Sequence, residues 1–160
     1  MKTKEKNMEH ELLVLFRKMI RIDLSAYLQE LSREEFYMLD LLSKQIQEKE
    51  IEGMKVSSIA EALDISSPAV SRMLGGMERK GYILRKVNPH NRRNTIVKIT
   101  KNGQKIYDKT ESQMNRLLDH VTKRVGQEDM EELLRLWNRV AEAFLEETKF
   151  ERSEEHTSEL

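Results

Sequence analysis

The sequence of 160 residues contains no cysteine. This absence excludes disulfides, thiolate metal sites and sensing by thiol oxidation, and it is compatible with the cytoplasm, where we expect the protein. Long apolar runs are also missing, and the charged N-terminus MKTKEKNMEHELL has no apolar stretch typical of a signal peptide. We therefore expect no association with a membrane.

Signatures of enzymes and of metal sites are missing from the sequence as well. It has no glycine-rich phosphate loop, no cluster of histidine and acidic residues with metal-ligand spacing, and no setting for a nucleophile. His10, His90 and His120 are far apart, and each is predicted on a helix surface or in a loop. We therefore expect a protein that is not an enzyme, with no catalytic residue, no metal and no cofactor.

Charge is distributed unevenly along a chain whose formal net charge is zero. Residues 54–105 hold 11 Lys and Arg but 3 Asp and Glu, whereas residues 106–160 hold 8 and 14. A basic centre between acidic flanks is typical of a nucleic-acid-binding module held by other helices.

Local patterns predict a mainly α fold with a small β-hairpin. A capping box formed by Ser32 and Glu35 predicts a helix start, Gly81 a helix end, and Thr100 the cap of a later helix. The predicted helices span about residues 8–29, 33 to the charged run before Gly53, 56–63, 67–80, 101–124 and 128–149, and the predicted strands span 82–87 and 95–100, joined by the loop NPHNRRN. Two short helices joined by a tight turn and followed by a hairpin with a basic tip form a winged helix-turn-helix, which indicates DNA as the partner.

The fourth predicted helix, which follows the turn, has one face for the core and one for DNA. If Val70, Leu74 and Met77 are buried, the opposite side of this helix is exposed near its N-terminus. Serine hydroxyls and an arginine there suit phosphates and base edges, and a small apolar side chain suits a thymine methyl, although Ser67 could serve only as a cap. The residues of this helix expected to contact DNA are Ser66, Ser67, Pro68, Ala69, Ser71 and Arg72.

The hairpin tip is the second expected DNA contact, through His90, Asn91, Arg92 and Arg93. Adjacent arginines at such a tip suit the minor groove or its flanking phosphates, and the alternative is an ordinary solvated surface.

Gly75 and Gly76 lie inside the predicted helix that precedes the hairpin, where each glycine destabilises the helix by roughly 1 kcal/mol relative to alanine. They allow close approach to DNA or to another helix, or are merely tolerated local weakness.

The block SIAEALDIS…SRM…ERKGYI (Ser58 to Ile83) and the wing RKVNPHNRRNTIVKIT followed by KNG resemble the MarR (multiple-antibiotic-resistance regulator) family of bacterial transcription factors over about residues 8–149. The resemblance implies that Arg93 is the minor-groove arginine. The chain departs from the family pattern at Asn91, where Asp is usual, at Asn94, where Gly is usual, and at the atypical Gly75-Gly76 pair.

The resemblance also implies a homodimer, a pseudo-palindromic operator and, in many members, a repressor released by a small aromatic or amphipathic effector. The DNA-binding lobe would span about residues 32–100, and the dimerisation helices about 8–30 and 101–149. From periodicity alone, the apolar faces of these helices could also close on the winged helix itself. The expected dimer residues are Leu12, Leu13, Phe16, Leu133, Trp137, Val140 and Phe144. Residues able to line an effector cleft, or simply to form core, are Phe16, Ile20, Tyr37 and Met38.

We therefore expect one MarR-like domain over residues 1–151 that regulates transcription. The alternative is a winged helix that binds another protein, for which an arginine pair on the wing and an outward Ser/Arg face would be unnecessary. The last nine residues, RSEEHTSEL, resemble the translation of a sequencing-library adapter rather than native sequence, with an ordinary polar tail as the alternative.

Overall fold

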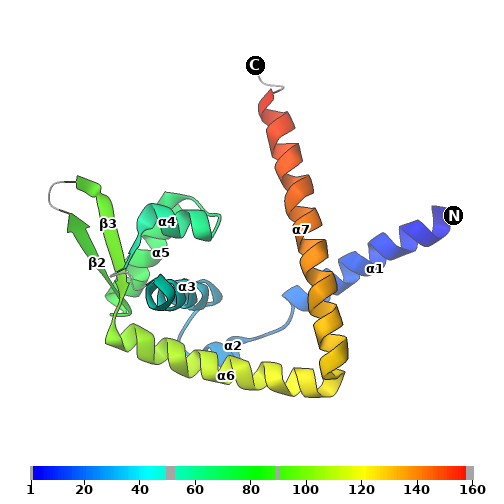
Figure 1. Ribbon diagram of the computed structural model, residues 1–160, viewed down its shortest axis with the longest axis horizontal. Helices are drawn as coiled ribbons and strands as arrows, with labels where there is room; N and C mark the ends of the chain where they lie inside the picture. Colours follow the sequence, from blue (N-terminus) through cyan, green and yellow to red (C-terminus); the bar gives the residue numbers. More distant parts are fainter. Residues whose placement is uncertain (1, 50–52, 89–90, 158–160) are drawn as a thin grey trace. The chain divides into compact units, whose positions relative to one another are not determined.

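The computed structural model describes the backbone of residues 2–49, 53–88 and 91–157, and the side chains of residues 7–45, 53–86 and 95–148. Its elements are α1 (Lys2–Ile20), α2 (Ser25–Leu28), α3 (Arg33–Lys49), β1 (Met54–Lys55), α4 (Val56–Ala62), α5 (Ser67–Arg79), β2 (Ile83–Asn88), β3 (Asn91–Ile99), α6 (Lys101–Val125) and α7 (Gln127–Thr157) (Figure 1). The chain divides into two compact units, Met1–Met114 and Asn115–Leu160, with the division inside α6. The predicted fold class, mainly helical with a β wing, is confirmed.

The N-terminal segment differs from the single helix predicted over residues 8–29. α1 ends at Ile20, and the short α2 begins at Ser25. The backbone N–H of Ser25 donates to the Asp23 carboxylate (2.9 Å), and this local contact competes with continuation of the helix. Gln29, with a φ of 58°, ends α2.

The start of α3 confirms the predicted capping box. The Ser32 hydroxyl accepts from the backbone N–H of Glu35 (3.1 Å), and the Glu35 carboxylate accepts from the backbone N–H of Ser32 (3.0 Å). These bonds satisfy backbone donors that have no partner within the helix, so this helix begins where the sequence predicts.

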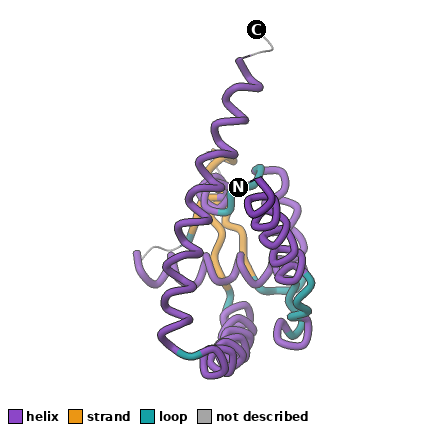
Figure 2. The backbone as a smooth tube through the Cα atoms, turned by 90° about the vertical axis from the view of Figure 1, so that its right-hand side faces the viewer, coloured by secondary structure: helices purple, strands orange, loops and turns teal. Residues whose placement is uncertain are grey.

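The sheet contains three antiparallel strands in the order β1-β3-β2. Its strands are drawn in orange in Figure 2. β1 is absent from the sequence-based prediction because two residues are too short to show alternation. Met54 pairs with Val97 and Lys55 with Ile96. The hairpin strands are also longer than predicted: β2 extends to Asn88 and β3 begins at Asn91, so part of the predicted loop is strand.

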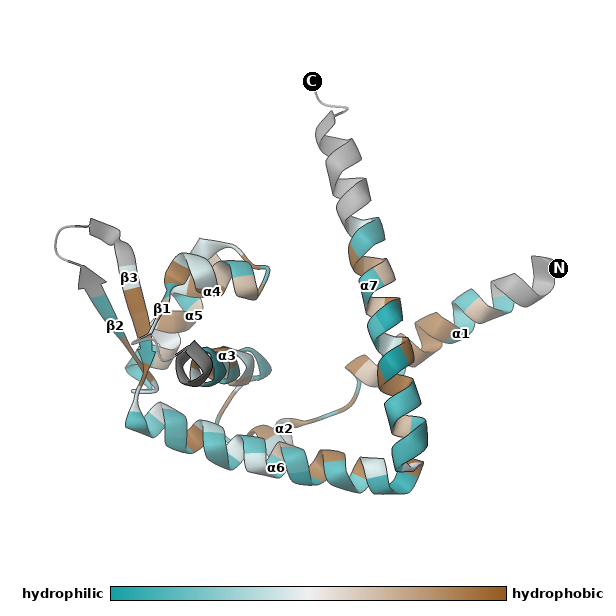
Figure 3. Ribbon diagram, in the orientation of Figure 1, coloured by the Kyte–Doolittle hydropathy of each residue, from teal (hydrophilic) through white to brown (hydrophobic). Residues whose placement is uncertain are grey.

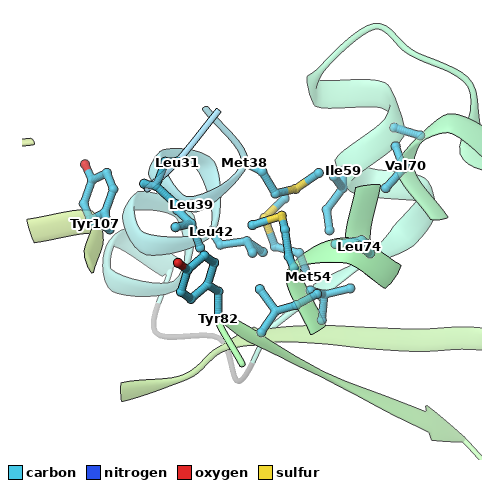
Figure 4. Close-up of a cluster of buried hydrophobic side chains, with 14 residues drawn as sticks. Leu31, Met38, Leu39, Leu42, Met54, Ile59, Val70, Leu74, Tyr82 and Tyr107 are labelled. Atoms are coloured by element: carbon cyan, nitrogen blue, oxygen red, sulfur yellow. The ribbon is translucent and has the colours of Figure 1, made fainter. Parts of the chain in front are cut away.

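A single apolar cluster joins the helices of the winged helix-turn-helix to the sheet. Figure 4 shows side chains from α3, α4 and α5 meeting between these helices, with Met54 and Tyr82 from the sheet region beside them. Val70, Leu74 and Met77 of α5 are fully buried, as predicted. The core of the first unit includes Met38, Leu39, Leu42, Met54, Ile59, Val70, Leu74, Met77, Ile83 and Val97.

The turn after α5 is a Schellman motif. Tyr82 N donates to Met77 O (2.9 Å) and Gly81 N donates to Glu78 O (3.0 Å), while Gly81 has a φ of 73°. A left-handed residue is therefore required at Gly81, in agreement with the predicted helix end.

The predicted cap of α6 is confirmed as well. The Thr100 hydroxyl accepts from Gly103 N (2.9 Å) and donates to the backbone of the turn before β2. In the first half of α6, the buried Tyr107 hydroxyl lies 2.7 Å from Asp40 of α3, which fixes this part of α6 on the lobe. Burial, together with hydrogen bonds to Asp40 and Glu111, raises the pKa of Tyr107 well above its ordinary value, so this phenol stays protonated.

The second unit comprises the end of α6 and α7. Gly126, with a φ of 102°, separates the two helices as predicted. α7 continues to Thr157, beyond the predicted end near Lys149 and into the segment interpreted as adapter-derived. In the described part of the chain, no helix is both long enough and apolar enough to cross a membrane.

Candidate nucleic-acid interface

α5 presents a polar surface opposite its buried face. The Ser66 hydroxyl accepts from Ala69 N (3.4 Å), which makes Ser66 the N-cap, and Pro68 lies in the first turn. Ala69 is half-buried, whereas the other predicted contacts, Ser66, Ser67, Pro68, Ser71 and Arg72, are exposed. The core therefore leaves the predicted DNA-facing residues accessible together.

The electrostatics of this end of α5 suit an anion. Its first turn contains no acidic residue, and its free backbone N–H groups carry partial positive charge. Arg72 adds a full positive charge one turn later. This arrangement can bind a phosphate or a base edge, and Ser66 serves as the cap at the same time.

An ion pair links α5 to the wing. Glu78 of α5 accepts from Arg85 of β2, through Nε (2.8 Å) and Nη2 (2.5 Å). The hydrogen bond from Arg85 lowers the pKa of Glu78 below its usual value. This pair could not be predicted from the sequence, since no local pattern relates a helix residue to a strand residue across a turn.

A second ion pair holds the C-terminal end of α5 on α3. The Lys80 ammonium donates to both oxygens of Glu35 (2.7 and 2.8 Å) and lies 5.8 Å from the centre of the Tyr82 ring. Glu35 therefore combines two tasks: it caps α3 and it fixes the end of the recognition helix. The capping pattern indicated the first of these tasks alone.

The wing residues lie elsewhere than predicted. Arg92 and Arg93 belong to strand β3 rather than to the loop at the tip, and Asn91 is the first residue of that strand. Their side chains are outside the described residues, as is the whole of His90. α5 and β2 pack side by side, so the wing lies next to α5 (Figure 1).

The predicted dimer residues are partly or largely exposed within one chain. Leu13 of α1, and Leu133 and Phe144 of α7, are at least half exposed, and Trp137 is 41% exposed. Leu12, Phe16 and Val140 are half-buried. Figure 3 shows hydrophobic positions recurring along both helices.

The predicted effector-cleft residues differ widely in exposure within one chain. Met38 is fully buried in the apolar core, which favours the alternative that this residue simply forms core. Its neighbour Tyr37 is 59% exposed and Ile20 is 74% exposed, while Phe16 is half-buried. A pocket of about 280 Å³ in the first unit has different lining residues: Glu30, Lys80, Tyr82, Asn102, Lys105, Ile106 and Lys109.

The titratable residues of the described segments form no metal centre. No group of three or more His, Asp or Glu side chains in those segments is arranged to hold an ion. His10 and His120 are exposed, as predicted.

Comparison with known proteins agrees with this geometry. The MarR family model matches residues 31–95, the segment that contains most of the apolar core, α5 and most of the wing. No curated protein matches the chain significantly.

Solved structures share the fold. A crystal structure of a MarR family transcription regulator is 18% identical, with a TM-score of 0.74, and covers 92% of this chain and 97% of its own. The S. aureus MepR–DNA complex is 23% identical, with a TM-score of 0.68 and coverage of 81% and 96%. A mutant of MarR from E. coli, complexed with operator DNA, is 21% identical, with a TM-score of 0.66 and coverage of 84% and 93%. Residues 31–95 thus match the MarR family model, and the chain shares its fold with these MarR-family structures.

Proposed function

We propose that this protein is a sequence-specific regulator of transcription that binds double-stranded DNA as a homodimer. The observation that supports this function best is the outer face of α5, where exposed serines and Arg72 surround a capped helix N-terminus beside the wing. MepR and MarR, which have the same fold, were each solved in complex with DNA. In this proposal α5 enters the major groove, and Arg92 and Arg93 contact the minor groove or its phosphates.

The exposed apolar side chains of α1 and α7 support the dimer. Clusters of large apolar side chains rarely stay in contact with water, and two-fold symmetry is the commonest way to cover such a face. A dimer would place two copies of α5 in successive major grooves, about 34–36 Å apart, and so read a pseudo-palindromic operator.

Repression that is relieved by a small aromatic or amphipathic ligand is the finer part of the proposal. The pocket in the first unit supports it, because Tyr82 and Ile106 provide apolar contacts and Lys80, Lys105 and Lys109 provide positive charge. Such a regulator would act in the cytoplasm of a bacterial cell, where the chromosome lies.

A winged helix that binds only protein is the alternative function. A protein-binding surface is usually apolar at its centre. The outer face of α5 instead combines serines with arginine, which favours DNA.

The test is a fluorescence-anisotropy titration of DNA from upstream of the protein's own gene, at two salt concentrations, with the wild type and two arginine variants. Arg72→Ala removes a residue of the proposed interface, and Arg116→Ala removes an exposed positive charge of α6 outside it. We expect saturable binding by two subunits per site, a loss of about tenfold or more for Arg72→Ala, and little change for Arg116→Ala. Weak binding equal to that of random DNA would favour the protein-binding alternative.

A further inference from the structure

Four of the six glycines in this chain are required by the fold. Gly81 and Gly126 have positive φ, which side chains rarely tolerate. A Cβ on Gly53 would lie 2.5 Å from the Val97 carbonyl oxygen, and one on Gly103 would lie 2.0 Å from the Tyr82 carbonyl oxygen, so both would collide with backbone.

Gly75 and Gly76 have no such reason within the protein. Both lie in the interior of α5 with helical backbone, and a Cβ on either would meet nothing nearer than 3.8 Å, at the mobile end of an arginine side chain. Alanine would fit at both positions and would favour the helix. Neither packing nor backbone geometry of the free chain therefore explains the pair.

The glycine pair lies on the outer surface of α5. Pro68, Arg72, Gly75 and Arg79 follow the spacing i, i+4, i+7 and i+11, which places them on one side of a helix. Leu74 and Met77 face the core on the opposite side. The half-buried glycines in the middle of this helix therefore leave its backbone without a side chain between the exposed Arg72 and Arg79.

Two guanidinium groups converge over this bare turn. The position that a Cβ of Gly75 would occupy is 3.8 Å from Arg79 Nη1 and 4.0 Å from Arg85 Nη2. The carboxylate of Glu78 orients Arg85 there through two hydrogen bonds. An anion placed where the missing side chain would be could contact both cations.

We propose that Gly75, Gly76, Arg79 and Arg85 form a seat for one phosphate of the DNA backbone. Arginine pairs with phosphate more strongly than a neutral donor does, and glycine lets that phosphate approach the helix closely. A methyl group at residue 75 would occupy the seat. This inference rests on the proposed DNA-binding function and adds a contact that is independent of base sequence.

The test compares Gly75→Ala, Arg79→Ala and the double variant with the wild type, and Arg116→Ala controls for the loss of a positive charge that is not part of the seat. Each is titrated with upstream DNA and with random DNA over a range of salt. We expect Gly75→Ala to raise the melting temperature of the free protein, yet to weaken binding severalfold on both DNAs. The slope of log K against log salt should fall by about 0.9 per subunit, and the double variant should bind no more weakly than Arg79→Ala.

Three other outcomes of these titrations would contradict the phosphate seat. If Gly75→Ala binds like the wild type with the same salt slope, the phosphate seat is wrong while the DNA-binding function stands. If Gly75→Ala weakens binding to upstream DNA but not to random DNA, the glycines face bases, and the seat is equally wrong. If the wild type binds neither DNA, the proposed function fails and the seat fails with it.

Discussion

Replacing glycine by alanine at two helix positions of this protein should change stability in opposite directions. At Gly103, in the first turn of α6, a Cβ would lie 2.0 Å from the Tyr82 carbonyl oxygen and 2.9 Å from the Tyr82 carbonyl carbon. That oxygen accepts from Thr100 N (3.0 Å) and from the Thr100 hydroxyl (3.1 Å), so it cannot move without loss of these bonds. At Gly75 the nearest atom is 3.8 Å away.

The size of each effect follows from two opposing terms. Gly→Ala in a helix gains up to about 1 kcal/mol of propensity. At Gly103, overpacking against backbone costs about 2–3 kcal/mol, at the upper end of the usual range, so a net loss of about 1–2 kcal/mol is expected. At Gly75 no clash opposes the gain, and a net stabilisation of about 0.5–1 kcal/mol is expected.

Urea denaturation followed by circular dichroism measures both free energies of unfolding. The two variants and the wild type must be compared at equal protein concentration, since a dimer is more stable when concentrated. The variants should differ by about 1.5–3 kcal/mol, or by about 3–12 °C in melting temperature. A Gly103→Ala variant as stable as the wild type, or a destabilised Gly75→Ala variant, would refute the reasoning from Cβ contacts.

Other substitutions test the core, the dimer, the wing and the ion pair. Leu74→Ala, at a fully buried position, should lower the free energy of unfolding by about 2–5 kcal/mol in urea denaturation, and an unchanged value would mean that α5 packs by another face. Trp137→Asp should dissociate the proposed dimer in sedimentation, whereas a stable, active dimer would show that α7 uses another face. Arg93→Ala should reduce the salt slope of DNA binding by about 0.9 per subunit; an unchanged slope counts against the wing contact. The hydrogen bond from Arg85 lowers the pKa of Glu78 below 4.5, so its stabilisation is present above about pH 4.5 and is lost as the pH falls through the lowered pKa. Glu78→Gln should therefore show a shallower acid loss of stability than the wild type, and identical acid unfolding curves would contradict this role.

Features set by neighbours in the sequence were predicted well. The capping box at Ser32 and Glu35, the left-handed Gly81 and the cap at Thr100 each depend on residues a few positions apart. The apolar spacing of α5 likewise identified Leu74 as core, and hence the exposed face. In such cases a short pattern and its physical cause coincide.

Features that depend on distant residues could not be predicted. The strand β1 forms because Met54 pairs with Val97 of β3, a contact that two residues cannot signal alone. The pairs Glu35–Lys80 and Glu78–Arg85 likewise join different elements.

The effector cleft shows a different limit of periodicity. Tyr37 and Met38 are adjacent in α3, where successive side chains diverge by about 100°. One is 59% exposed and the other is fully buried, although both were expected to line an effector cleft or to form core. Periodicity identifies a face of a helix, but not which residue at its edge is covered.

Sequence-specific recognition is tested most directly by the affinity of the purified protein for upstream DNA relative to a scrambled duplex of the same length, at one salt concentration. If α5 recognises base sequence, the affinity for the upstream site should exceed that for the scrambled duplex by about 10³-fold or more. Equal affinity for the two duplexes would contradict sequence-specific recognition by α5.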